Sequence, residues 1–257
     1  MSVDFEMEGG VATITINRPE RLNAMDADHY AALSDAWQRV RDDHDIRCAI
    51  ITGEGERSFT TGADIKSFIN APPDLAEMWL SQKDQLLNRG LEVWKPIIAA
   101  VNGYCLGGGM TLLMATDIRL ASPNATFSLA EVKRGVVAGN GGTQRILSQL
   151  PYAIGMEMVL TGDPMDAETA ARWGLINRVV PAEDLMVEAR TIAEKLAGNA
   201  PLAMQAAKEL AIRAKEMPLN TGLRYEQMVN RLLMTSEDAK EGPAAFKEKR
   251  KPDFKGA

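Results

Sequence analysis

Two short glycine-containing segments, residues 61–65 and 102–109, constrain this chain most, because each follows an apolar run typical of a strand and precedes a run typical of a helix. Glycine lets a chain turn sharply and lets another oxygen atom approach the main chain closely. The first backbone amides of the following helix have no hydrogen-bond partner within that helix. Two such turns can hold one oxyanion between them, so the sequence predicts catalysis by backbone N–H groups.

Conventional catalytic side chains are scarce in this sequence. Its only histidines are His29 and His44, and its only cysteines are Cys48 and Cys105. The helical pattern places His29 on an exposed face, and His44 lies in an acidic run, so neither is well placed for proton transfer. The cysteines have neither disulfide-framework nor zinc-site spacing, and no ligand cluster suggests a metal or a redox cofactor.

The composition and charge of the chain restrict its partners. With 257 residues, 46% of them hydrophobic, the chain can fill one substantial core. Its net charge of −6 argues against nucleic acid as the main partner, since phosphate binding needs a basic surface. No run approaches the roughly 20 apolar residues of a membrane span, and residues 1–10 carry acids where a leader peptide carries bases. We therefore expect a cytoplasmic protein with no membrane and no nucleic-acid partner.

Strand patterns alternate with helix patterns along the first two thirds of the chain. Asp26 precedes apolar residues at three- and four-residue spacing, which predicts a helix with an acidic start. Strands separated by helices are typical of an α/β fold with crossover connections. The predicted strands span residues 11–17, 48–52, 96–101 and 118–121. The predicted helices that follow span residues 143–150, 154–160, 167–173 and 184–197.

From Pro201 onward the sequence shows only helical periodicity, with a break at Met217 and Pro218. One face of these helices is apolar, and an apolar face needs a partner surface. We expect it either to fold back on the same chain or to be buried against a neighbouring subunit. The side chains of this face include Leu223, Met228, Leu232 and Leu233.

A series of motifs, in order along nearly the whole chain, resembles the crotonase (enoyl-CoA hydratase/isomerase) superfamily. These motifs are TGADIK at 61–66, AAVNG at 99–103, GGG at 107–109, GGTQR at 141–145, EMVLTG at 157–162, AARWGL at 170–175, EGP at 241–243 and FKEKR at 246–250. The resemblance implies a ClpP/crotonase-like α/β spiral of ββα units over residues 1–198. It implies a helical oligomerisation region over residues 199–257, and assembly as a homotrimer or hexamer.

The resemblance also implies a substrate and a site. The substrates would be acyl-CoA thioesters, with coenzyme A as part of the substrate rather than a cofactor. The backbone N–H groups of Ala63 and Gly108 would polarise the thioester carbonyl and stabilise an enolate-like species. Lysine suits phosphate as a compact charge, and Lys66 would meet the phosphates of coenzyme A. The implied substrate contacts are Ala63, Asp64, Ile65, Lys66, Gly108 and Gly139.

The family uses up to two glutamates for proton transfer, and this chain retains one of them. Glu131 stands at the second position and Thr111 at the first. Glu131 alone can move a proton between two carbons, as in a Δ3-Δ2 enoyl-CoA isomerase, or it can activate a water that the Thr111 hydroxyl positions in a hydratase. A specialised acyl-CoA lyase or dehydratase and a non-catalytic acyl-CoA-binding homologue are further alternatives. An apolar pocket would raise the pKa of Glu131.

Three more side chains have two interpretations each. Asn140 is either a contact for substrate or water, or a residue that caps its loop. Trp79 and Trp94 can line an acyl channel. Large aromatic side chains more often pack in a core, so we favour core packing for both tryptophans.

Overall fold

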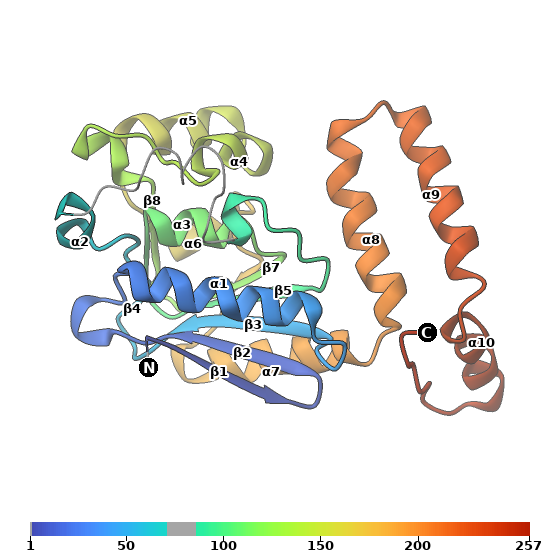
Figure 1. Ribbon diagram of the computed structural model, residues 1–257. Helices are drawn as coiled ribbons and strands as arrows, with labels where there is room; N and C mark the ends of the chain where they lie inside the picture. The colour runs from blue at the N-terminus through green and yellow to red at the C-terminus, as the bar shows by residue number, and fades with distance from the viewer. Residues whose placement is uncertain (1, 71–85) are drawn as a thin grey trace.

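The computed structural model describes residues 2–70 and 86–257, so Trp79 lies outside the described residues. Two β-sheets form the centre of the fold, and helices cover them (Figure 1). The larger sheet has the strand order β1-β2-β3-β5-β7-β10, and the smaller has the order β4-β6-β8-β9. Within the described part of the chain, no helix is long and apolar enough to span a bilayer.

The larger sheet is mostly parallel. Only β1 runs antiparallel to its neighbour β2, and the other adjacent strands pair in parallel. Its strands are β1 (Val3–Glu8), β2 (Val11–Ile16), β3 (Cys48–Gly53), β5 (Ile97–Val101), β7 (Ile118–Ala121) and β10 (Arg178–Val179). The four predicted strands correspond to β2, β3, β5 and β7 and are confirmed. The edge strand β1 was not predicted; its acidic residue Asp4 is half exposed, and Glu6 and Glu8 are exposed.

The smaller sheet consists of very short strands, β4 (Ser58–Thr60), β6 (Tyr104–Leu106), β8 (Thr126–Ser128) and β9 (Met165–Asp166). Its first three strands each follow a strand of the larger sheet and lead to a short helix. These helices are α2 (Ile65–Asn70), α3 (Gly108–Leu113) and the 3₁₀ helix η4 (Ala130–Arg134). The described chain therefore contains three strand-strand-helix units, and the second strand of each unit belongs to the smaller sheet.

Helices lie on both faces of the larger sheet (Figure 1). The helix α1 (Ala27–Asp42) covers one face, where Trp37 is fully buried, and Asp26 caps its first turn as predicted. The helix α7 (Leu185–Ala197) covers the other face through Leu185, Ala189 and Ala193. Burial on both faces explains why all six residues of β3 are buried. The predicted helices α4 (Gly142–Gln149), α5 (Tyr152–Thr161) and α6 (Ala167–Arg172) are confirmed as well.

The C-terminal region forms an antiparallel helical hairpin that stands beside the sheets (Figure 1). Its helices are α8 (Pro201–Arg213), η6 (Ala214–Glu216), α9 (Leu219–Leu233) and α10 (Asp238–Glu248), so the predicted break at Met217 and Pro218 is confirmed. The apolar face of α9 does not fold back on this chain, because Leu223, Met228 and Leu232 are 51%, 67% and 71% exposed.

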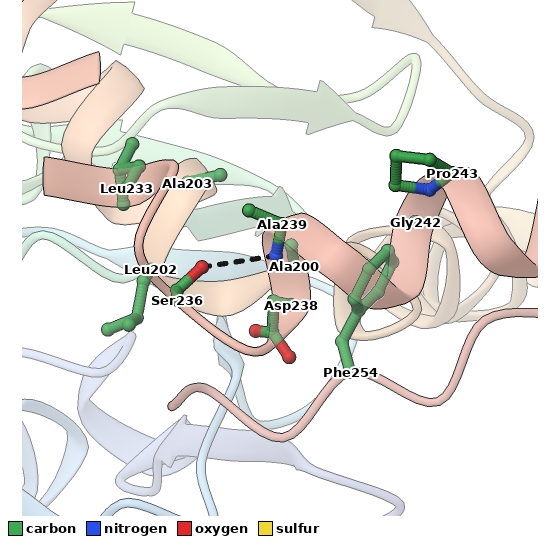
Figure 2. Close-up of a pocket in the computed structure, with 10 residues that line it drawn as sticks. All are labelled: Ala200, Leu202, Ala203, Leu233, Ser236, Asp238, Ala239, Gly242, Pro243 and Phe254. Atoms are coloured by element: carbon green, nitrogen blue, oxygen red, sulfur yellow. Dashed lines mark hydrogen bonds between the residues drawn. The ribbon is translucent and has the colours of Figure 1, made fainter. Parts of the chain in front are cut away.

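The end of the chain is tied to the start of α10 (Figure 2). The buried Asp238 carboxylate accepts hydrogen bonds from the backbone N–H groups of Lys255 (2.7 Å) and Gly256 (2.9 Å). The Ser236 hydroxyl accepts one from the backbone N–H of Ala239 (3.1 Å). Phe254 lines a cavity of about 250 Å³ between α8, α9 and α10. These contacts hold the C-terminal tail against the hairpin.

Candidate active site

The two predicted glycine turns meet backbone to backbone. A Cβ atom added at Gly62 would lie 2.5 Å from the amide nitrogen of Gly108, and Gly62 has a φ of +84°. A Cβ atom added at Gly108 would lie 3.1 Å from the Gly62 Cα and 3.4 Å from the Ala63 nitrogen. We call residues 62–63 and 107–108 the paired turns. Only glycine allows this approach at position 62, because a side chain would need both a strained φ and space that the backbone fills.

The directions of the two amides follow from their local structure. Met25 forms a parallel bridge with Ala63, in which Met25 N–H bonds to the Gly62 carbonyl and Asp64 N–H bonds to the Met25 carbonyl (both 2.8 Å). This bridge uses the peptide groups on either side of Ala63 and directs the Ala63 N–H away from residue 25. The Gly108 N–H belongs to the first turn of α3, where amides have no partner inside the helix. The paired turns thus present two neighbouring N–H groups.

The first of the paired turns is held in place by Arg18, which lies outside the sequence motifs. Its guanidinium pairs with the carboxylates of Asp64 and Asp26, each at 3.1 Å. Asp64 therefore faces Arg18, whereas Ile65 and Lys66 at the start of α2 are exposed. The structure does not test the predicted contacts of these three residues with coenzyme A.

The Glu131 side chain lies against the second of the paired turns. A Cβ atom at Gly107 would be 3.3 Å from its Oε1. Its Oε2 is buried and has no hydrogen-bond partner within the described residues. Burial raises the pKa of the Glu131 carboxyl, while a hydrogen bond from its own backbone and the charge of Arg134 oppose the rise. A carboxyl group in such surroundings takes up a proton more readily than a solvated one.

The Thr111 side chain is buried in α3, and both roles of its hydroxyl are occupied. The hydroxyl donates to the Gly108 carbonyl (2.9 Å) and accepts from the Asn88 side-chain amide (3.0 Å). A hydroxyl has a single proton to donate. The structure thus gives Thr111 a supporting contact with the peptide group that follows the Gly108 amide. Asn88 carries no sequence signal, since it lies 23 residues away from Thr111.

The helix α1 contributes Tyr30 to the site. Its hydroxyl lies 3.4 Å from the Cβ position at Gly108. Burial raises the pKa of Tyr30 to about 12; Arg89 opposes this rise and the Glu131 charge adds to it. The neighbouring His29 was expected on an exposed face of α1, and this expectation is wrong. His29 is buried because its Nδ1 lies 2.6 Å from Asp26 Oδ1 at the start of the helix.

The loop before α4 carries Gly139 and Asn140. Among the described residues, none lies within 4 Å of a Cβ atom added at Gly139. Asn140 has a left-handed φ of +53° and accepts a hydrogen bond from Arg89 Nε at its side-chain oxygen (2.9 Å). Trp94 instead lines a cleft of about 780 Å³ against α8, where it lies under Arg213. No cluster of three metal-binding side chains occurs in the described ranges.

Comparison with known proteins extends over the whole chain. The family profile described as Enoyl-CoA hydratase/isomerase matches residues 6–257. The chain is 45% identical over 259 residues to (E)-benzylidenesuccinyl-CoA hydratase of Thauera aromatica, with 100% of each chain covered. It is 42% identical to carnitinyl-CoA dehydratase of Salmonella enteritidis, over 99% of this chain and 98% of the relative. Among solved structures, enoyl-CoA hydratase of Bacillus anthracis has a TM-score of 0.92 at 31% identity, with 100% of both chains covered.

Proposed function

Since the chain belongs to the enoyl-CoA hydratase/isomerase family, we propose that it adds water to an enoyl-CoA thioester with Glu131 as its single proton-transfer residue. Members of this family act on acyl-CoA thioesters, and the crotonase fold predicted from the motifs is confirmed by the solved relatives. The single observation that carries the proposal is the meeting of the paired turns with the Glu131 carboxyl.

The proposed reaction uses backbone and side chain in two steps. In the first, the Glu131 carboxylate takes a proton from water while the water oxygen bonds to C3 of the enoyl group. The electron pair of the C2–C3 double bond moves into the thioester, and the N–H groups of Ala63 and Gly108 stabilise the resulting enolate oxygen. In the second step, the protonated Glu131 returns the proton to C2. The sum of the two steps is the addition of one water, and the reverse sequence is a dehydration.

The surroundings of Glu131 support both halves of this cycle. Its raised pKa brings the carboxyl nearer to the range in which one group can act first as base and then as acid. The relatives named as a hydratase and a dehydratase favour water addition or loss over other chemistry of the fold.

A second candidate, the Δ3-Δ2 isomerase, is favoured by one observation at Thr111. Its hydroxyl proton is held by the Gly108 carbonyl, so Glu131 would work without a second group to orient water. An isomerase needs only one base that removes a proton from C2 of a 3-enoyl-CoA and returns it to C4. This candidate uses the same enolate and the same oxyanion contacts.

Product analysis distinguishes the two candidates. Purified protein is incubated separately with crotonyl-CoA and with a 3-enoyl-CoA, and the products are resolved by liquid chromatography with mass detection. Hydration gives a product heavier by one water from crotonyl-CoA, whereas isomerisation gives an isobaric 2-enoyl-CoA from the 3-enoyl substrate. Binding of both thioesters without turnover would contradict both candidates and would favour a non-catalytic acyl-CoA-binding role.

The exposed face of α9 supports a further part of the proposal, a homotrimer or hexamer. Leu223, Met228 and Leu232 are exposed apolar side chains of α9, although other residues of this helix pack against α8. A second copy of the chain would bury them. Size-exclusion chromatography with light scattering should give a multiple of the chain mass, and a monomer at micromolar concentration would contradict the assembly.

A further inference from the structure

Arg89 places a cation close to the paired turns. The residue ends the 3₁₀ helix η3 (Leu87–Arg89), and its guanidinium carbon lies 5.8 Å from the centroid of the Tyr30 ring. The hydroxyl of the same ring lies 3.4 Å from the Cβ position at Gly108. One tyrosine ring therefore separates the guanidinium from the turn that carries the Gly108 amide. An arginine over an aromatic face is held there by the ring quadrupole, which fixes its position without neutralising its charge.

The charge of Arg89 has no carboxylate partner within residues 2–70 and 86–257. Its side chain donates one hydrogen bond in that part of the chain, from Nε to the Asn140 side-chain oxygen. A guanidinium has five N–H donors in a planar fork, and four of them are on its two terminal nitrogens. That fork matches the two oxygens of a carboxylate, which makes arginine the preferred partner where a carboxylate must be recognised.

A second arginine, Arg145, also contacts Asn140. Arg145 donates to the backbone carbonyls of Asn88 (3.0 Å) and Asn140 (3.4 Å), and it forms no ion pair with a carboxylate of the described chain. Burial lowers the pKa of Arg145, as expected for a guanidinium surrounded by neutral acceptors. The loop at Asn140 thus contacts two positive groups in a chain whose net charge is −6.

We propose that Arg89 binds a carboxylate on the acyl group, so that the substrate is an enoyl-CoA thioester with a second acidic group. The inference rests on the proposed function, because it names the substrate class of the same site. The acyl group would leave the paired turns along the Tyr30 ring, and its carboxylate would meet the terminal nitrogens of Arg89. The Glu131 carboxyl stays at the reacting carbons, on the Gly107 side of the turn.

If Arg89 had only a structural role, its loss would affect acidic and neutral substrates differently from what our proposal predicts. If the residue only holds Asn140, its loss should slow the turnover of every enoyl-CoA by the same factor. If it binds a carboxylate, its loss should affect acidic substrates and leave neutral ones unchanged. Comparing an acid with its methyl ester separates the two roles, since the ester has nearly the same shape and lacks the charge.

The decisive experiment measures kcat/KM for a trans-2-enoyl-CoA with a terminal carboxyl group and for its methyl ester. We expect the wild type to prefer the acid by about 10- to 100-fold, the range for a charged hydrogen-bonded contact. Arg89→Gln should remove this preference by slowing the acid alone, and Arg89→Lys should keep part of it. The matched control is Arg178→Gln, an exposed arginine of β10 that pairs with Glu188. Equal rates for acid and ester in the wild type, or an equal loss of both in Arg89→Gln, would overturn the inference.

Binding of saturated analogues separates this inference from the proposed function. Isothermal titration calorimetry with the saturated acid and its methyl ester needs no chemistry. Tighter binding of the acid that disappears in Arg89→Gln supports the role of Arg89 even if no enoyl-CoA is hydrated, in which case only the hydratase proposal fails. Hydration with equal binding of acid and ester leaves the hydratase proposal intact and refutes the role of Arg89.

Discussion

The two halves of the candidate site use different kinds of chemistry. The paired turns offer main-chain N–H groups, whose positions depend on glycines that cannot carry a side chain without displacing the backbone. Glu131 offers a side chain on a separate element, η4, and its carboxyl can be altered while the fold is kept. A backbone site is therefore inseparable from folding, whereas a side-chain site can be tested alone. Mutations in the two halves should differ in what they do to stability.

The largest effect is expected at Glu131. Glu131→Gln keeps the size of the side chain and removes its proton-transfer ability, so kcat should fall by about 10²- to 10⁴-fold. The melting temperature should not fall, because Oε2 has no hydrogen-bond partner to lose within the described chain. Turnover with the substrate identified by product analysis provides the measurement, together with thermal melting. Glu183→Gln, at an exposed acid remote in sequence, is the matched control. A fully active Glu131→Gln enzyme would end the proposed mechanism.

The second largest effect on kcat is expected at Gly62, in the backbone half of the site. Gly62→Ala places a Cβ atom 2.5 Å from the Gly108 nitrogen at a φ of +84°, so the paired turns must separate. Loss of one oxyanion donor lowers kcat by about 10²- to 10³-fold. Unlike Glu131→Gln, this variant should also lower the melting temperature.

The control for the backbone half is Gly198→Ala at the end of α7. There the added atom makes ordinary contacts at 3.5 Å or more and φ is −78°. Circular dichroism melts and kcat should match the wild type for this variant. If Gly62→Ala lost activity at an unchanged melting temperature, the contrast between the two halves would not hold.

A smaller effect is expected at Thr111, which contacts the backbone half of the site through the Gly108 carbonyl. Thr111→Val leaves that carbonyl and the Asn88 amide without their partner, which should cost about 1–3 kcal/mol of unfolding free energy. We expect kcat to fall by about tenfold or less. Thr111→Ser keeps the hydroxyl and should recover most of the stability in urea titrations. A loss of kcat in Thr111→Val with unchanged stability would instead support the water-positioning role.

The parts of the fold that the sequence predicted share a local signal. Continuous apolar runs predicted β3 and β5, because a strand buried on both faces has an apolar sequence. Alternation of threonine with isoleucine predicted β2, and the short run of residues 118–121 predicted β7. The strands of the smaller sheet, two or three residues long, are too short for any alternation to be visible. The strand β1 was missed because its acidic and largely exposed sequence, typical of an edge strand, lacks an apolar run.

The residues of the candidate site also fall into two groups, those that sequence motifs locate and those that only the fold brings together. Its glycines and Glu131 belong to motifs, so the resemblance located them. Tyr30, Asn88 and Arg89 reach the site from elements far away in the sequence, and only tertiary contacts bring them there. His29 was placed wrongly because the apolar pattern of α1 does not record its bond to Asp26.

The smallest expected effect is a pH-dependent shift in stability that again separates the two halves. The folded-state pKa of Glu131 is raised by burial, so the protonated carboxyl is favoured in the folded protein. The contribution of Glu131 is fully present below the unfolded pKa and is lost as pH rises through the folded pKa. A neutral glutamine does not ionise, so Glu131→Gln should melt slightly higher than the wild type at pH 8. The difference should shrink toward pH 4.

Gly62→Ala should melt lower than the wild type at every pH, because its defect is steric. If the difference in melting temperature between Gly62→Ala and the wild type changed with pH, the defect would be electrostatic instead.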